Sequence, residues 1–258
     1  FKTSYKATGA AEADITSVSD MDSGEGYDRA TLTLLGRQQE LLAALRQTGK
    51  PLVVVYIEGR PLDKSWAAAH ADALLTAYYP GQEGGQAIAD VLFGDYNPAG
   101  RLPISVPVGE GQLPVYYNKR APKPHNYVEM SAAPLYPFGY GLSYTRFAYS
   151  NLSVTPQGSD YLVSFDVQNV GDRDGEEVAQ LYLHDQVASV SQPMLQLRHF
   201  ARVAIKKGAT RRVSFTVTPE DLSIVNREMQ TVVEPGDFDV MVGGSSDNLP
   251  LRGVITVR

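Results

Sequence analysis

Cysteine is absent from the 258 residues of the sequence, which excludes disulfide scaffolds, zinc ribbons and thiol catalysis. Long apolar runs are missing too. The longest, Leu52–Ile57, has the length of a strand and falls far short of the roughly 20 residues that cross a bilayer, so we expect no membrane partner. The sequence begins at Phe1, without Met and without the charged-then-apolar pattern of a signal peptide. We therefore expect a mature fragment or a processed subunit.

Positive charge is also scarce. The 23 basic residues face 29 acidic ones, which gives a net charge of −6, and no basic stripe is present that could neutralise phosphates. Nucleic acid is therefore not expected as a partner. The rest of the composition, with 43% hydrophobic and 20% charged residues, is that of an ordered globular protein, and the length suits two domains.

Apolar runs alternate with helix-like segments in the first part of the chain. Leu52–Ile57 is continuously apolar, as in a parallel strand covered on both faces. Leu41, Leu42 and Leu45 share one face of a helix that ends at Gly49. The elements expected, in order, are a strand at 13–19, a helix at 36–47, a strand at 52–57, a helix at 63–70 capped by Asp63 or Ser65, a strand at 74–79, a helix at 85–93 and a strand at 102–106. This order predicts an α/β domain with an open, mostly parallel sheet.

The texture changes after this first part. Residues 107–148 are rich in Pro, Gly and Tyr, and the aromatics of 136–144 predict an ordered connection that packs on the domains. Beyond it, short alternating segments follow one another between turn signals. Seven strands are expected, at 151–155, 161–169, 177–184, 198–205, 210–217, 237–243 and 251–257. This pattern predicts a fibronectin-III-like or immunoglobulin-like sandwich, so we divide the chain into an α/β domain at 1–148, which includes the connection, and an all-β domain at 149–258.

Motifs for metal, phosphate and serine chemistry are weak or missing. None of the four histidines has ligand spacing to another, and we expect no metal site; they are His70, His125, His184 and His199. The glycine-rich segment 81–85 opens a helix and could hold an anion, but it lacks the remainder of a phosphate loop. A tight turn between strand and helix is the preferred interpretation. No GxSxG motif supports a serine hydrolase.

The loop around Glu25 is the remaining candidate for chemistry. Glu25 lies between Gly24 and Gly26 and follows the first predicted strand. In open α/β sheets the ligand crevice lies at the carboxyl ends of the strands. A general acid needs a raised pKa, which burial by a ligand or by a second domain would supply. The residues alone leave two interpretations open, a solvated loop glutamate as the default and a catalytic acid as the alternative.

Several motifs, in order along nearly the whole chain, carry a family resemblance. They are SGEGYDR at 23–29, GKP at 49–51, GRPL at 59–62, YPGQEGG at 79–85, ADVLFGDYNPAGRLP at 89–103, LPVYYN at 113–118, the segment 136–147, VQNVG at 167–171 and the segment 175–183. Together they resemble the family 3 glycoside hydrolases. The resemblance is strongest to bacterial β-glucosidases, including the periplasmic type.

This resemblance implies a missing part and a mechanism. Family members have an N-terminal (β/α)8 barrel before the α/β sandwich and fibronectin-like domains that this chain resembles. They are retaining enzymes, in which a barrel Asp attacks the anomeric carbon and a Glu acts as acid and then as base. Glu25, four residues before Arg29, matches the acid/base position. The nucleophile is expected outside this chain, because Asp20 lies in the wrong domain and Asp160 lies in a turn of the predicted sandwich.

The resemblance thus implies the C-terminal part of a retaining, exo-acting β-glycosidase. A β-glucosidase is expected first, acting on a β-linked gluco-oligosaccharide or an aryl or alkyl glucoside, without a cofactor and only together with the barrel-bearing chain or domain. No substrate-binding residue is assigned beyond Glu25. A periplasmic or secreted location is favoured over a cytoplasmic one. The alternatives are a β-xylosidase of the same family and a non-catalytic carbohydrate-binding or adhesion module.

Overall fold

The computed structural model describes residues 29–120 and 127–258. Contacts divide this part of the chain into two compact units. The first holds residues 29–88 and 107–113, and the second holds residues 89–106 and 114–258. The predicted domain division at residue 148 stays a prediction. The predicted strand at 13–19 and the carboxylates of the Glu25 loop up to Asp28 lie outside the described residues.

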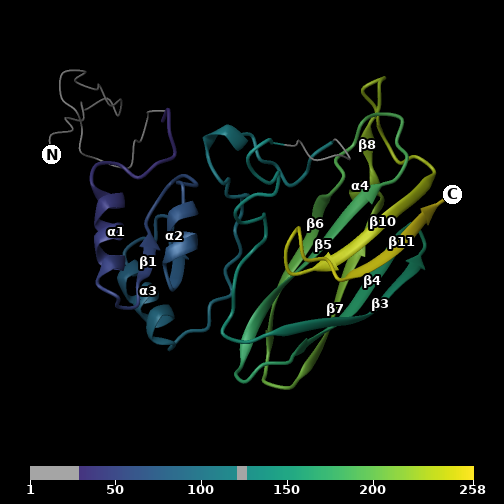
Figure 1. Cartoon of the computed structure of the whole chain (residues 1–258). Helices are drawn as coiled ribbons and strands as arrows, with labels where there is room; N and C mark the ends of the chain where they lie inside the picture. Colours follow the sequence, from purple (N-terminus) through teal and green to yellow (C-terminus); the bar gives the residue numbers. More distant parts are fainter. Residues whose placement is uncertain (1–28, 121–126) are drawn as a thin grey trace, which may run out of the picture. The chain divides into compact units, whose positions relative to one another are not determined.

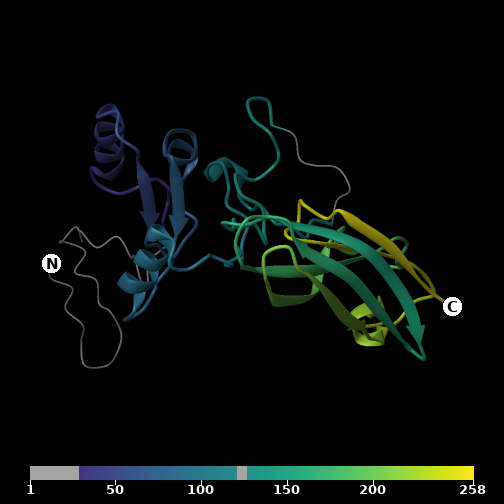
Figure 2. The same ribbon diagram turned by 90° about the horizontal axis from the view of Figure 1, so that it is seen from below.

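The first unit is built on a parallel pair of strands, β1 (Val53–Tyr56) and β2 (Ala73–Thr76), with Val53 opposite Ala73. Helices precede, connect and follow the two strands: α1 (Gln38–Gln47), α2 (Ser65–His70) and α3 (Gly84–Phe93), within which the boundary between the units falls. Figures 1 and 2 show the strands side by side with these helices around them. A short 3-10 helix, η1 (Glu110–Gln112), completes the unit. This α/β order confirms the predicted fold class.

Packing in this unit follows the predicted pattern only in part. Val54 and Tyr56 of β1 are buried with Ala67 of α2, and Leu42 of α1 packs against them. Leu41 and Leu45, which were expected on the same helix face, are largely exposed. Among the described residues, no helix is long and apolar enough to cross a membrane.

The strand predicted at 102–106 is wrong. Only Val106 forms an isolated bridge there, antiparallel to Tyr136, and the backbone of Leu102 pairs with residues 139 and 140. Pro103 has no N–H to give to a ladder, so this stretch cannot join a parallel sheet as a regular strand. It belongs instead to the second unit.

The second unit is a sandwich of two antiparallel sheets. One sheet has the order β11-β10-β5-β6 and the other the order β3-β4-β7. The strands are β3 (Phe147–Gln157), β4 (Asp160–Asn169), β5 (Gly175–Asp185), β6 (Gln196–Ile205), β7 (Thr210–Val217), β10 (Gly236–Gly243) and β11 (Leu251–Val257). All seven predicted strands are confirmed. The sequence analysis missed the short helix α4 (Pro219–Leu222) and the two-residue strands β8 (Ile224–Val225) and β9 (Thr231–Val232).

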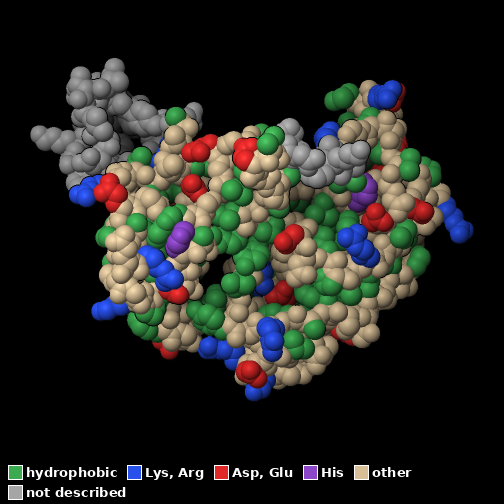
Figure 3. All heavy atoms as spheres, in the orientation of Figure 1, with side chains coloured by type: hydrophobic (Ala, Val, Ile, Leu, Met, Phe, Trp, Pro, Cys, Tyr) green, Lys and Arg blue, Asp and Glu red, His purple; other side chains and the backbone are tan. Residues whose placement is uncertain are grey.

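Alternating side chains from both sheets fill the core of the sandwich. Phe165 of β4, Leu181 of β5 and Val240 of β10 are among its fully buried members. Burial of such side chains is worth about 1.5–3 kcal/mol each, so this core supplies much of the stability of the unit. On the face drawn in Figure 3, acidic and basic side chains are interspersed around the apolar ones.

The connection before β3 packs on the sandwich, as its aromatic content predicted. Tyr117 stacks on Phe138 with ring centroids 4.1 Å apart and meets Tyr182 of β5 edge-on. Gln180, also on β5, donates hydrogen bonds from its amide nitrogen to the carbonyls of Gly139 (3.1 Å) and Gly244 (2.6 Å). The connection is therefore part of the folded unit and not a tether.

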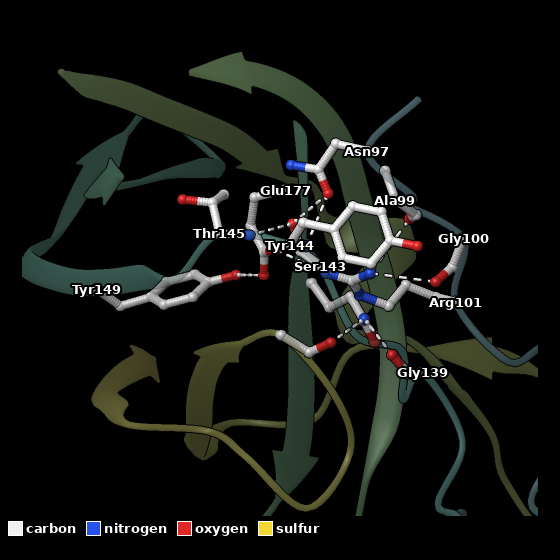
Figure 4. A network of polar contacts seen from close by, with 12 residues as sticks. Asn97, Ala99, Gly100, Arg101, Gly139, Ser143, Tyr144, Thr145, Tyr149 and Glu177 are labelled. Atoms are coloured by element: carbon white, nitrogen blue, oxygen red, sulfur yellow. Dashed lines mark hydrogen bonds and ion pairs between the residues drawn. The ribbon is translucent and has the colours of Figure 1, made fainter. Parts of the chain in front are cut away.

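A buried ion pair joins the segment after α3 to the sandwich (Figure 4). Arg101 donates to Glu177 of β5 over 2.6 Å, and a second nitrogen of its guanidinium donates to the carbonyls of Ala99 and Gly100. The hydroxyl of Tyr149 donates to the other oxygen of Glu177 over 2.7 Å. Burial raises the pKa of Glu177, an effect that the charge of Arg101 opposes.

We expect Arg101→Met to lower the free energy of unfolding of the second unit by about 3–5 kcal/mol, because it leaves the Glu177 carboxylate buried without a counter-ion. The double variant Arg101→Met with Glu177→Met should recover most of this loss. Urea unfolding followed by circular dichroism measures both. Arg212→Met, which breaks the more exposed pair with Asp166 on the same sandwich, is the control and should change little. Equal losses in the single and double variants would contradict this account.

The phenol of Tyr149 should make the protein sensitive to alkali. Burial raises the pKa of Tyr149, so the folded state keeps a proton that the unfolded state loses near pH 10. The free energy of unfolding should therefore fall as the pH rises above about 10, by up to about 1.4 kcal/mol per pH unit for this group. Tyr149→Phe should make that fall shallower in urea titrations between pH 9 and 11. Tyr116→Phe, at a largely exposed ring, should leave it as it is.

Candidate functional site

A cavity of about 390 Å³ opens in the first unit where β1 ends. The carboxyl ends of parallel strands are where α/β sheets bind ligands. The walls come from the end of β1 and the loop behind it, from α1 and from the segment before it, and from the residue that precedes Pro80. The lining residues include Arg29, Gln38, Ile57, Glu58, Arg60 and Tyr79. Arg29 and Arg60 belong to two of the motifs that carry the family resemblance.

Arg29 is the residue nearest to the predicted acid/base that the structure describes. Glu25 lies outside the described residues, as do Asp20, Asp22 and Asp28. Arg29 follows Glu25 by four residues and lines the cavity. The structure thus places Arg29, the last residue of the motif that contains Glu25, at the cavity.

Three hydrogen bonds fix the segment that begins at Arg29. The guanidinium of Arg29 donates to the carbonyl of Thr33 over 2.6 Å. The N–H of Leu32 donates to the carboxylate of Glu110 over 2.6 Å, and the Leu32 carbonyl accepts from the N–H of Asp63 over 2.7 Å. The bond from Leu32 lowers the pKa of Glu110 because it stabilises the charged carboxylate. Leu32 itself is buried, so both of its backbone groups need these partners.

A buried ion pair forms part of the cavity wall, to which it contributes Glu58. Glu58 and Lys64 are 4% and 2% exposed, and the ammonium nitrogen of Lys64 lies 2.6 Å from Oε1 and 2.7 Å from Oε2 of the carboxylate. The hydroxyl of Thr76 donates to Glu58 Oε1 over 3.2 Å, and the ammonium stands 4.7 Å from the ring centroid of Tyr56. Burial lowers the pKa of Lys64, and the hydrogen bond and charge of Glu58 oppose that shift.

Two tyrosines follow β2, and the second of them, Tyr79, lines the cavity. Tyr78 has φ 52°, a left-handed conformation that is strained for a residue with a side chain, and its carbonyl accepts from the N–H of Glu58 over 3.2 Å. Tyr79 is 63% exposed, and its ring covers Gly59 so closely that a Cβ there would lie 2.8 Å from two ring carbons. An exposed aromatic ring beside a mainly apolar cavity that also holds charged side chains offers a surface on which an apolar ligand face can stack.

The described histidines, which the sequence analysis considered as metal ligands, contact other protein groups. His70 stacks on Trp66 with centroids 4.5 Å apart, His184 lies 3.3 Å from the carbonyl of Pro193, and His199 pairs with Asp221 at 3.0 Å. No group of metal-ligating side chains gathers within the part of the chain that the structure describes, in which His125 is not included.

Two further segments have the local structure expected of them. The glycine-rich segment at 81–85 is the expected turn into α3, with Gly81 at φ 73°. Asp160 begins β4 at the hairpin that joins it to β3.

The sequence analysis missed Glu58, Lys64 and Tyr78. One signal could have found the first two, because a carboxylate directly after an apolar strand enters the interior with it and needs a nearby cation. The expectation that this strand is covered on both faces is wrong, since Val53 is 48% and Ile57 is 63% exposed and only one face is buried. The left-handed backbone of Tyr78 has no such signal in the sequence.

Comparisons with known proteins place these features in a family. Residues 2–144 match the family model described as the glycosyl hydrolase family 3 C-terminal domain, and residues 177–246 match that of the fibronectin type III-like domain. A periplasmic β-glucosidase of Salmonella typhimurium is 43% identical over 237 residues, covering 86% of this chain and 31% of the relative. A β-xylosidase of Formosa agariphila is 42% identical over 245 residues, covering 91% of this chain and 34% of that relative.

Solved structures of β-glucosidases also superpose on this chain. A β-glucosidase from Listeria innocua, crystallised with glucose, superposes with a TM-score of 0.85 at 37% identity, covering 91% of this chain and 34% of that one. A β-glucosidase from Erythrobacter marinus gives 0.86 at 42% identity, covering 90% and 31%. The chain therefore spans about a third of the length of the relatives it matches.

Gly59→Ala should displace the ring of Tyr79, because the new Cβ would overlap it. The atoms it would meet are the far end of the largely exposed Tyr79 side chain, which can turn aside, so the free energy of unfolding should fall by no more than about 1 kcal/mol. Gly85→Ala in α3 is the matched control: its Cβ would meet no atom within 4 Å, so it should raise stability by up to about 1 kcal/mol. Thermal melting of the two variants should therefore give shifts of opposite sign. A shift of the same sign in both would refute the close contact between Gly59 and Tyr79.

Proposed function

Because the chain belongs to glycosyl hydrolase family 3, we propose that it supplies the acid/base half of the active site of a retaining, exo-acting β-glycosidase. A β-glucosidase is the first candidate for the whole protein. The remaining part of that protein would hold the (β/α)8 barrel and the nucleophilic carboxylate. The observation that carries this proposal is the position of Arg29, which follows Glu25 by four residues and lines the cavity at the end of β1.

The proposed chemistry needs two carboxyl groups and one proton. An Asp of the barrel attacks the anomeric carbon while Glu25 donates its proton to the glycosidic oxygen, and the aglycone leaves. Glu25, now a carboxylate, takes a proton from water, which attacks the glycosyl ester and releases the sugar with its configuration retained. The two carboxyl groups must stand about 5–5.5 Å apart, so the site would be shared between this chain and the barrel.

Glu25 must carry a proton at the start of this cycle and none at its midpoint. A glutamate achieves this when its pKa is raised toward the working pH by exclusion of water. In this proposal a substrate on the cavity, together with the barrel, excludes water from the loop. The hydrogen bonds at Leu32 fix the segment that follows Glu25 in the sequence.

A β-xylosidase is the second candidate, supported by the Formosa agariphila relative at 42% identity. Glucose and xylose differ in the substituent at C5, and no residue of the cavity is assigned to read it. Comparing kcat/KM for nitrophenyl β-glucoside and β-xyloside on the complete protein decides between them. The name of the Salmonella typhimurium relative supports a periplasmic or secreted location.

In the complete protein, Glu25→Ala should cripple the hydrolysis of cellobiose by roughly 10²–10⁴-fold, since its leaving sugar needs a proton. A dinitrophenyl β-glucoside leaves without one, so formation of the glycosyl-enzyme should be nearly unaffected and its hydrolysis slow. Azide is a nucleophile that needs no base, so it should restore turnover of the dinitrophenyl β-glucoside by this variant and yield the β-glycosyl azide.

Asp22→Ala is the matched control on the same loop and should hydrolyse cellobiose normally without a response to azide. If Glu25→Ala hydrolyses cellobiose at the wild-type rate, the acid/base is another residue, and Asp22 and Asp28 become the candidates.

A further inference from the structure

We propose that the buried pair of Glu58 and Lys64 is a positioning device for the segment that follows the acid/base loop. The inference rests on the proposed function, because it concerns residues 29–33, which begin at the last residue of the motif that contains Glu25. Its physical content is a chain of backbone hydrogen bonds that runs from the ion pair to Leu32.

The first step is a grip on one residue by both charges. Glu58 Oε2 accepts from the N–H of Leu62 over 3.3 Å, and Lys64 Nζ donates to the carbonyl of Leu62 over 3.3 Å. The carboxylate and the ammonium thus hold the two polar groups of Leu62 on the loop that lines the cavity. An apolar pair of the same volume could fill this space but could not make either bond.

The second step passes from Leu62 to its neighbour. Asp63 donates its N–H to the carbonyl of Leu32 over 2.7 Å, and its carboxylate accepts from the N–H of Ser65, the first residue of α2, over 2.8 Å. Asp63 is therefore fixed from both sides, by Leu62 before it and by the start of the helix after it.

The third step reaches the loop. Leu32 lies seven residues after Glu25 in the sequence. Its carbonyl accepts a hydrogen bond from Asp63, and its N–H donates one to Glu110. Arg29 lies between Glu25 and Leu32 in the sequence, and its guanidinium donates a hydrogen bond to the carbonyl of Thr33, the residue after Leu32. A shift of Leu62 would therefore move the anchor of the segment on which the Glu25 loop ends.

Stability alone is a poor reason for this ion pair. Taking two charges out of water is costly, and replacing a buried pair by apolar side chains is often neutral or stabilising. The hydrogen bonds of the pair to Leu62 and Thr76 give it a directional role that such a replacement would lose. A positioning role and a purely structural role thus predict different outcomes for an apolar replacement.

The test uses the complete protein with Glu58→Met and Lys64→Met combined. We expect urea unfolding to be close to that of the wild type, kcat/KM for cellobiose to fall tenfold or more, and kcat/KM for a dinitrophenyl β-glucoside to fall less than threefold. The ratio of the two is the decisive readout, because a loss of folded protein lowers both values equally. Arg37→Met with Glu40→Met, which removes an exposed pair of the same unit, is the control and should leave the ratio unchanged.

Glu58→Gln keeps the volume and one acceptor oxygen, and it serves if the double variant does not fold; the ratio should change in the same direction. If the ratio of the two kcat/KM values is unchanged in the variants that fold, whether both values stay the same or fall equally, the positioning role is overturned. The proposed function fails separately, because it is Glu25→Ala, and not these variants, that must lose cellobiose hydrolysis and respond to azide.

Discussion

A buried carboxylate needs a cation beside it, and both units depend on this constraint. Glu58 in the first unit and Glu177 in the second are each more than nine-tenths buried, and each meets a cation at 2.6 Å. A lone carboxylate at either position would cost several kcal/mol, so the loops that bring Lys64 and Arg101 to them have little freedom. The conformation of the cavity wall and that of the segment after α3 both follow from this requirement.

The two pairs differ in what they organise. Arg101 also donates to the carbonyls of Ala99 and Gly100, so Glu177 fixes a segment that would otherwise be a loop outside the sandwich. Lys64 and Glu58 hold Leu62, and through Asp63 they hold Leu32. In the proposed function the first pair shapes the scaffold, whereas the second acts on the part of the chain that leads to Glu25. The strained backbone of Tyr78 belongs to the same corner, since its carbonyl receives the N–H of Glu58.

The sequence predicted the sandwich well because its seven main strands are short apolar-rich segments between clear turn signals. Buried and exposed residues alternate cleanly in β7, whereas β5 and β10 each contain a continuous buried run. It failed at 102–106, where an apolar run between prolines looks like a strand but pairs irregularly with residues 135–140. It could not foresee the pair of Arg101 and Glu177, which are 76 residues apart and meet only after the sheets form. The role of Glu25 came from a family resemblance. Composition and spacing alone left it a solvated loop residue.

The central claim is that the active site is shared, with the acid/base on this chain and the nucleophile on the rest of the protein. Mechanism-based labelling tests it most directly. The complete protein is inactivated with a 2-deoxy-2-fluoro-β-glucoside carrying a dinitrophenyl leaving group, digested, and mapped by mass spectrometry. The account predicts one sugar per protein, bound to an aspartate outside these 258 residues. A label on Asp20, or on any other carboxylate of this chain, would contradict it.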